Sequence, residues 1–421
     1  MDTLTLSEFE TSRAIPLTAQ QRDALGILAP SVNVTPTRGA DGRYDLTPGS
    51  TIGALSLPGM AIEIRPKIKV DRVLFLLSYA LDPRAWRRLN FCFEARENLL
   101  EALVPAFILQ VRQAFQRGLL QGYRSEEATL ASVRGRVRFD DQLRRRFGVV
   151  PPVEVRYDEF TEDIEPNRLL RAVGDRLERM KLRSVASRTS LRWLRSALER
   201  VTLSDYHPAH LPEIAWNRLN EHYRPAVDLA RLILQCISFD LRHGGVTASA
   251  FLIDMNEVFE SFVVTALREA LRLSPQAFPR GAKGRQLWLD RGRAVRLEPD
   301  LSWWEGPVCR FVGDVKYKRV NTAGIKHPDL YQLLAYTVAA NLPCGLLVYA
   351  AGEGEPITHE VVEVEKRLEV VTLDLSGDPE EILGQVEAVA ERIHEMARTG
   401  IGGIAPRHRS TPARFVSRAT V

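Results

Sequence analysis

The chain is poor in cysteine: Cys92, Cys236, Cys309 and Cys344 stand far apart among 421 residues, and no CxxC pair occurs. That spacing argues against a disulfide framework or a zinc knuckle and fits a reducing compartment. Long apolar runs are missing too, since stretches such as LVPAFILQV end well short of the roughly 20 residues that a membrane-spanning helix needs. The amino terminus, MDTLTLSEFETSRAIP, lacks the basic and apolar regions of a signal peptide. These absences predict a soluble, cytoplasmic protein with no membrane partner.

Several catalytic signatures are also absent. No GxxxxGK[ST] occurs, so the sequence offers no Walker A loop for a nucleotide. The eight histidines lack HExxH or similar spacing, and no GxSxG is present. The commonest nucleotide-binding, zinc-hydrolase and serine-hydrolase sites are therefore excluded.

What is present has the balance of a globular protein, with 45% hydrophobic and 26% charged residues. A chain of 421 residues is too long for one ordinary core, so two or three domains are expected. The formal net charge of +4 permits a nucleic-acid partner without requiring one.

Periodicity predicts an α+β multidomain protein. Residues 1–70 form a β-rich module, in which TIGALSLPGMAIEIRPKIKV alternates around Pro58 and Gly59 as a hairpin does. Residues 71–245 show apolar spacings of three and four and should be mainly helical, a region that we expect to dock on a partner. Within it, the charged segment 124–167 predicts a projecting hairpin or loop.

A further unit is expected over residues 246–400, where the patterns run helix, strand, strand, helix and strand. This order predicts an α/β domain with a mixed central sheet flanked by helices. The last segment, 401–421, holds arginines and a histidine but no acidic residue, and predicts a flexible basic tail.

The stretch LEPDLSWWEGPVCRFVGDVKYKR carries the most informative chemistry. Asp300 and Asp314 lie among apolar residues of two expected neighbouring strands, where a charge is expensive to bury unless it is paired or binds a metal. Two such carboxylates can converge on Mg²⁺, which prefers oxygen ligands. Lys316 follows Asp314 by two positions and shares its face of the strand. There it can orient a water molecule or stabilise charge that develops on a phosphate.

Three further residues extend this candidate site. Glu260 borders the buried stripe of the preceding helix and is a candidate third metal ligand. Gln332 and Tyr336 stand one helical turn apart on the following helix, so both can face the site or DNA phosphates. A D-x-K triplet alone is more often a surface ion pair, and only the ordered set favours a nuclease.

This ordered set resembles the PD-(D/E)xK nucleases, and within them the McrC family, the nuclease subunit of McrBC-type systems that restrict DNA carrying 5-methylcytosine. The likeness rests on MNEVFESFV, LEPD, GDVKYK and DLYQLLAY, and in the amino-terminal half on IEIRPKI and DEFTEDIEPNRLLR. It implies a catalytic set of Asp300, Asp314, Lys316, Glu260, Gln332 and Tyr336.

The resemblance also implies a cofactor and a partner. Mg²⁺ would be held by Asp300, Asp314 and Glu260. The partner would be a hexameric McrB-type AAA+ GTPase that recognises modified double-stranded DNA, and whose nucleotide hydrolysis this chain would stimulate. By the same resemblance, the chain alone would be inactive as a nuclease.

Two other functions stay open at this point. The chain could be a non-cleaving activator of a AAA+ motor, although unpaired charges in strands then lack a physical reason. It could also be a stand-alone repair nuclease, although its large non-nuclease half argues against that.

Overall fold

The computed structural model describes residues 2–29, 32–81, 83, 99–180, 182–207, 210–243, 246–281, 286–318, 327–350 and 357–399. These residues form a mixed α/β protein. Contacts divide the chain into two compact units, Met1–Thr265 with Leu375–Pro379 and Ala266–Asp374 with Glu380–Val421. No helix in the described ranges combines the length and apolar character that a bilayer crossing requires. The expected basic tail, 401–421, lies outside the described residues.

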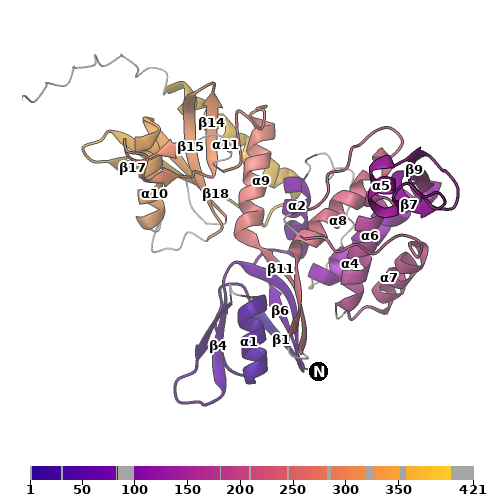
Figure 1. The fold of residues 1–421 in the computed structure, drawn as a ribbon. Helices are drawn as coiled ribbons and strands as arrows, with labels where there is room; N and C mark the ends of the chain where they lie inside the picture. The colour runs from indigo at the N-terminus through magenta and orange to yellow at the C-terminus, as the bar shows by residue number, and fades with distance from the viewer. Residues whose placement is uncertain are drawn as a thin grey trace, which may run out of the picture. The chain divides into compact units, whose positions relative to one another are not determined.

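The first unit contains a five-stranded sheet in the order β1–β6–β5–β11–β10 (Figure 1). Its strands are β1 (Asp2–Ser7), β5 (Thr51–Leu57), β6 (Met60–Arg65), β10 (Ile237–His243) and β11 (Val246–Asp254). β1 runs parallel to β6, and all other neighbours are antiparallel. β5 and β6 are joined at Pro58 and Gly59, which confirms the predicted hairpin.

A smaller sheet and one helix pack with the five-stranded sheet. They are β2 (Ser12–Pro16), β4 (Arg43–Pro48) and β3 (Val32–Pro36), in that order, and α1 (Ala19–Leu28). α1 begins with a capping box, in which Thr18 and Gln21 each accept a backbone hydrogen bond from the other. Leu25 of the helix, Leu46 of the small sheet and Ile62 of the large sheet belong to one buried core.

Strands β10 and β11 differ from the expectation of a mainly helical region over residues 71–245 and of a new unit that starts with a helix from residue 246. In sequence, Ile237, Phe239 and Leu241 alternate with polar residues, a strand period that competes with the helical one. β11 returns to pair with β5, where Gly53 has a φ of +131°. A Cβ atom at Gly53 would lie 2.0 Å from the carbonyl oxygen of Phe251, so this close approach requires glycine.

The segment between β6 and β10 is mainly helical, as the spacing of its apolar residues predicts. Its helices are α2 (Val70–Leu81), α4 (Leu99–Ala114), α6 (Glu165–Arg179), α7 (Val185–Ala197) and α8 (Arg224–Cys236), with the 3₁₀ turns η1 (Phe115–Arg117) and η2 (Glu221–Tyr223). α4 and α6 each pack against α7 and α8. Phe107 and Tyr223 are fully buried among them.

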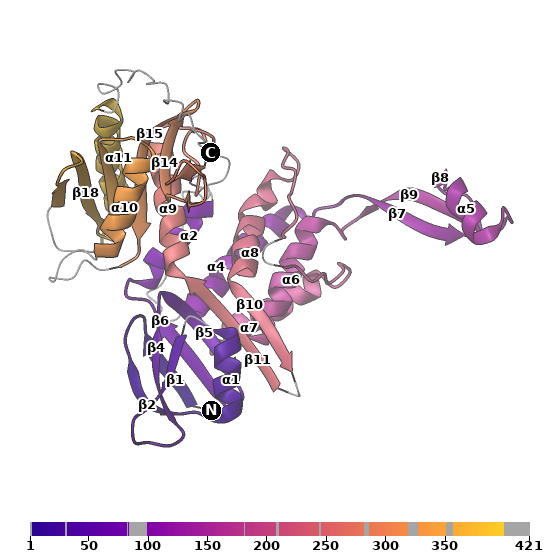
Figure 2. The same ribbon diagram turned by 60° about the vertical axis from the view of Figure 1, so that its left-hand side comes forward.

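A long β-hairpin leaves this helical segment. It consists of β7 (Gly122–Leu130), β8 (Arg136–Val137), α5 (Phe139–Arg146) and β9 (Val153–Thr161), and Figure 2 shows its two long strands extending away from the helices. The charge and turn residues of segment 124–167 predict such an excursion. Its tip, residues 131–150, carries α5.

Asp163 and three partners fix the base of the hairpin, and we call these four residues, Asp163, Arg124, Arg168 and Thr202, the Asp163 clamp. Asp163 is 6% exposed and accepts hydrogen bonds from the side chain of Arg124 on β7, from Arg168 Nε of α6 at 2.7 Å and from the backbone N–H of Thr202 at 2.8 Å. The bonds from Arg168, and then those from Thr202, hold the pKa of Asp163 well below its usual range despite its burial. The direction of the hairpin is therefore set by charge-assisted bonds at its base.

Helix α9 (Met255–Ala270) passes from the first unit into the second, which contains a mixed sheet in the order β14–β15–β16–β18–β17. The strands are β14 (Leu301–Glu305), β15 (Val308–Lys316), β16 (Cys344–Ala350), β17 (Ile357–Val361) and β18 (Lys366–Leu373), with a short ladder of β12 (Leu287–Trp288) and β13 (Arg296–Leu297). β15, β16 and β18 are parallel, whereas β14 and β17 are antiparallel edge strands. The predicted mixed sheet is thus present, although β17 and β18 were not anticipated.

Two helices cover the sheet of the second unit: α10 (His327–Ala339) and α11 (Pro379–Thr399). Leu368 and Val370 of β18 pack with Leu333 of α10. Between them, Glu369 accepts a hydrogen bond from Arg392 of α11 at 2.6 Å. Because successive residues of a strand point to opposite faces, the two helices lie on opposite sides of the sheet.

Candidate active site

The structure brings Asp300 and Asp314 together at one end of the paired strands β14 and β15. Leu301 of β14 pairs with Gly313 of β15, so Asp300, just before Leu301, and Asp314, just after Gly313, lie at the same end of the two antiparallel strands. Asp300 Oδ2 accepts a hydrogen bond of 3.0 Å from the backbone N–H of Val315. Asp314 is 1% exposed. Two neighbouring strands thus hold the carboxylates at the edge of a packed core.

The electrostatics of Asp300 reflect this arrangement. Burial, and next the negative charge of Asp314, raise the pKa of Asp300 to about 7. The N–H of Val315 and the charge of Lys316 oppose that shift. Two carboxyl groups this close resist carrying two negative charges without a cation between them.

Lys316 provides one positive charge beside them. Its ammonium group forms an ion pair with Asp314 Oδ2, and its side chain is 20% exposed. Burial alone would lower the pKa of Lys316, but the carboxylates of Asp314 and Asp300 outweigh burial and raise it. Lys316 therefore stays charged and reaches the surface beside buried Asp314 and half-buried Asp300.

The donor set fits a hard divalent cation. Neither side-chain oxygen of Asp314 accepts an aligned hydrogen bond from the described residues, and both are buried. Lys316 offsets the charge at Oδ2, but a buried carboxylate without aligned hydrogen bonds is still costly unless a cation binds it. Among the described residues, no three His, Cys, Asp or Glu side chains lie close enough to hold an ion. Mg²⁺ commonly binds proteins through one or two carboxylates plus water and phosphate, so a pair suffices.

Gln332 and Tyr336 lie together on α10. Gln332 Nε2 donates a hydrogen bond of 2.6 Å to the hydroxyl oxygen of Tyr336, which donates one of 3.1 Å to the backbone carbonyl of Glu298. Burial, and then the charge of Asp314, raise the pKa of Tyr336. Tyr336 is buried and holds the segment that precedes Asp300, whereas Gln332 is exposed.

Glu260 lies half-buried on α9, in the part of the helix that belongs to the first unit. Its role as a third metal ligand stays a prediction.

The sequence reasoning missed a second polar group in the same unit. Asp329 of α10 is 6% exposed and lies 3.3 Å from the ammonium nitrogen of Lys318, and the hydroxyl of Tyr349 donates to it at 2.7 Å. The helical spacing of Asp329, Gln332 and Tyr336 could have predicted it, because these three residues share one face of the helix.

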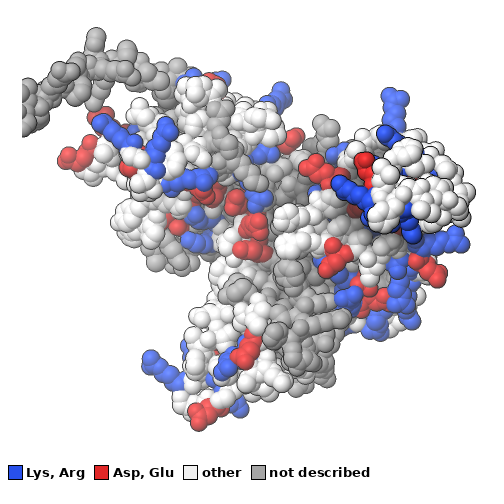
Figure 3. Space-filling model, viewed as in Figure 1, with Lys and Arg blue, Asp and Glu red and all other residues white. Residues whose placement is uncertain are grey.

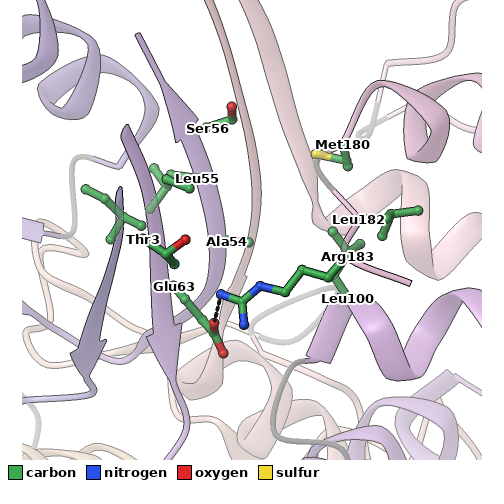
Figure 4. Close-up of a pocket in the computed structure, with 11 residues that line it drawn as sticks. Thr3, Ala54, Leu55, Ser56, Glu63, Leu100, Met180, Leu182 and Arg183 are labelled. Carbon is green, nitrogen blue, oxygen red and sulfur yellow. Dashed lines mark ion pairs between the residues drawn. The ribbon is translucent and has the colours of Figure 1, made fainter. Parts of the chain in front are cut away.

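A separate pocket of about 170 Å³ lies in the first unit, between the five-stranded sheet and the helical segment (Figure 4). Its wall is mostly apolar, with Leu55, Leu100 and Met180 among its residues. Glu63 and Arg183 face each other there at 3.6 Å. These charges neutralise each other, so the pocket offers no group poised for catalysis.

Replacing Asp300 by asparagine is expected to stabilise the metal-free protein, and to do so more at about pH 8 than at about pH 5. The pKa of the parent carboxyl rises from 3.8 to about 7 on folding, so the folded state keeps a proton that the unfolded chain has lost. The stability that this retained proton gives the parent protein is fully present below pH 3.8 and is lost as the pH rises through about 7. The gain can reach roughly 4 kcal/mol. Denaturant unfolding with a chelator measures it, and a gain independent of pH would contradict the prediction.

Comparison with known proteins gives an independent result. The chain matches the family model of the McrBC 5-methylcytosine restriction system component over residues 46–350, more than half of its length. A search of curated proteins found no match.

Two solved structures are similar. A chain from the refined half-complex of a tetradecameric assembly of Thermococcus gammatolerans McrB AAA+ hexamers with bound McrC aligns with a TM-score of 0.59 and 18% identity, covering 93% of this chain and 100% of that chain. A chain from the Thermococcus gammatolerans McrBC complex gives a TM-score of 0.42 and 20% identity, covering 64% of this chain and 88% of that chain. The first alignment indicates a shared fold.

Proposed function

The chain belongs to the family of McrBC 5-methylcytosine restriction system components, and on that premise we propose that it is the endonuclease subunit of a modification-dependent restriction complex. It would hydrolyse phosphodiester bonds in double-stranded DNA with Mg²⁺. The observation that carries the proposal is the pair Asp300 and Asp314, whose carboxylates meet on neighbouring strands beside Lys316.

The placement of these groups supports a PD-(D/E)xK nuclease core. Asp300 precedes β14, and Asp314 and Lys316 lie on β15, an interior strand of a mixed sheet. Gln332 and Tyr336 follow on α10, which covers that sheet. The buried carboxylate of Asp314, which accepts no aligned hydrogen bond from the described residues, weighs against a site kept only as structure.

Asp300 and Asp314 would hold Mg²⁺, with Glu260 as a candidate third ligand. When bound, the ion supplies a Lewis acid for the phosphate and lowers the pKa of a coordinated water. Lys316, kept charged by the two carboxylates, would stabilise the negative charge that grows on the phosphate or orient the attacking water. Tyr336 would position the chain before Asp300, and exposed Gln332 would contact DNA.

We further propose that the partner is a hexameric McrB-type AAA+ GTPase, which recognises modified DNA, and that the hairpin contacts it. The tip exposes large apolar side chains without a core function, at Phe139 (72%), Leu143 (61%) and Phe147 (89%). Exposed apolar clusters rimmed by charge are typical of protein interfaces. Figure 3 shows basic side chains around this part of the surface.

Arg136 on β8 and Arg138 at the start of α5 are the two arginines that we consider for a contact with the motor, and their contacts favour Arg136. Arg138 forms ion pairs with Glu127 at 2.7 Å and with Asp141, so its charge is already used within the hairpin. Arg136 is exposed and has no carboxylate partner among the described residues. An arginine that stabilises charge on a hydrolysing nucleotide must have its guanidinium available.

The proposed function is tested by combining the chain with its AAA+ partner, Mg²⁺ and either GTP or ATP, and comparing methylated with unmethylated plasmid. Cleavage of the methylated plasmid alone, dependent on both subunits, is the expected result. Stimulated hydrolysis without cleavage would instead indicate a non-cleaving activator. Cleavage without the partner would indicate a stand-alone nuclease.

Lys316→Ala is expected to reduce the cleavage rate by roughly a hundredfold or more while DNA affinity changes little. The reason is that Lys316 acts on charge that develops in the transition state, whereas one phosphate contact contributes little to total binding. Single-turnover cleavage and a binding titration separate the two effects. Collapsed binding with a normal rate on bound DNA would refute this role.

A further inference from the structure

A second cation lies beside the candidate active site, and its surroundings differ from those of an ordinary surface lysine. Lys318 stands just after β15, and its backbone N–H donates to the carbonyl of Lys316 at 2.9 Å. This three-residue turn fixes where the side chain of Lys318 begins. The side chain is 36% exposed, so its ammonium group is reachable from solvent.

The group that holds Lys318 is built into the core. Both oxygens of Asp329 lie 3.3 Å from the ammonium nitrogen, and the side chain of Asp329 is only 8% exposed. Tyr349, which is 2% exposed, donates its hydroxyl to Asp329 at 2.7 Å. Burial, and then Asp329, raise the pKa of Tyr349, so it remains a donor. A buried carboxylate and a buried tyrosine thus orient one half-exposed cation.

The position of this group relates it to the active site. Tyr349 on β16 is the register partner of Lys316 on β15. Asp329 lies on the same helix as Gln332 and Tyr336. The ends of β15 and β16 and the first turn of α10 therefore place Lys318 next to the catalytic lysine.

The chemistry of Lys318 suits a phosphate. A lysine ammonium has three hydrogen-bond donors, of which Asp329 can occupy two. The third is left for an anion from solvent. Lysine binds phosphate as a point charge and needs no planar geometry.

We infer that Lys318, held by Asp329 and Tyr349, binds a DNA phosphate that flanks the phosphodiester at the Asp300–Asp314 pair. This inference rests on the proposed nuclease function and deepens it. Lys316 acts on the reacting phosphate. Lys318 binds a neighbouring phosphate and so fixes the position of the DNA strand relative to the active site. Lys318 is a substrate-binding residue, and Asp329 and Tyr349 are positioning residues.

The test measures binding of the full-length chain to a short DNA duplex in a chelating buffer over a series of salt concentrations. Loss of one phosphate contact lowers the slope of log affinity against log salt by about 0.9 for B-DNA. Lys318→Ala is expected to show that reduction, and Lys318→Arg is expected to restore the parent slope. A purely structural lysine would change stability without changing the slope.

The matched control is Arg310→Ala. Arg310 is another partly exposed cation of β15, paired with Glu305 at 2.8 Å near the opposite end of the strand. Its removal is expected to leave the slope unchanged. If Lys318→Ala fails to fold because Asp329 loses its partner, the double variant Lys318→Met with Asp329→Asn removes both charges and must show the same reduced slope.

In the assembled complex, Lys318→Ala is expected to raise KM for DNA several-fold and to leave kcat nearly unchanged, because a contact to a non-reacting phosphate is made equally before and in the transition state. An unchanged slope in a folded Lys318 variant, an equal change in Arg310→Ala, or a parent chain that binds no duplex would overturn the inference. Failure of the parent complex to cleave methylated DNA would instead overturn the proposed function.

Discussion

Asp314→Ala is expected to abolish DNA cleavage by the assembled complex while the chain still folds and still stimulates its partner. Loss of a metal ligand removes several kcal/mol of charge stabilisation in the transition state, which corresponds to roughly a thousandfold or more in rate. Folding should survive because the substitution also removes the repulsion that Asp314 exerts on Asp300. Plasmid cleavage, nucleotide hydrolysis and thermal unfolding together measure these three properties.

The matched control for this variant is Glu305→Ala. Glu305 is an acid at the far end of β14, 53% exposed and paired with Arg310, so its loss is expected to leave cleavage at the parent level. Full cleavage by Asp314→Ala would show that the wrong site has been identified. Equal loss in both variants would point to damage of the sheet rather than of the site.

Replacing the hairpin tip, residues 131–150, by a short Gly-Ser linker is expected to abolish both stimulation of the partner and assembly-dependent cleavage. The tip exposes large apolar side chains, and interface residues of that kind each contribute about 2 kcal/mol or more when they are central. Loss of two such contacts weakens binding roughly a thousandfold. The helices should keep their fold because the Asp163 clamp lies at the other end of the hairpin.

Single substitutions refine that experiment. Phe147→Ala removes a side chain that is 89% exposed, so it should leave the stability of the free chain unchanged while it weakens assembly. Leu219→Ala is the control, since Leu219 is 81% exposed in the same unit but lies outside the hairpin. A linker variant that stimulates hydrolysis as well as the parent would exclude the hairpin. The hairpin near Pro58–Pro66 would then be the next candidate.

The parts of the fold that could be predicted from sequence are those with one dominant period. The alternation around Pro58 and Gly59 predicts a hairpin that the structure contains, and the apolar spacing of DLYQLLAY predicts α10. The proximity of Asp300 to Asp314 follows from placing two charges in adjacent apolar strands, where burial forces them to share a partner.

Other features depend on contacts that no local pattern encodes. β11 carries TASAFLID directly before a helix, and only its pairing with β5, far away in the sequence, decides that it is a strand. The approach of Lys318 to Asp329 depends on how α10 is seated on the sheet. For Glu260, the helical pattern predicts a third metal ligand, and that role stays a prediction.

The strand order of the first sheet has a consequence for synthesis of the chain on the ribosome. β5 and β6 emerge early, but β11 must pair with β5 and ends at Asp254. The helices and the hairpin between β6 and β10 are therefore synthesised before the five-stranded sheet can be completed. Until then β5 has an open edge, which is the kind of surface that captures other chains. Such late, long-range pairing slows folding. A nascent chain released before Asp254 should expose this edge and aggregate, whereas one released after α9 should not.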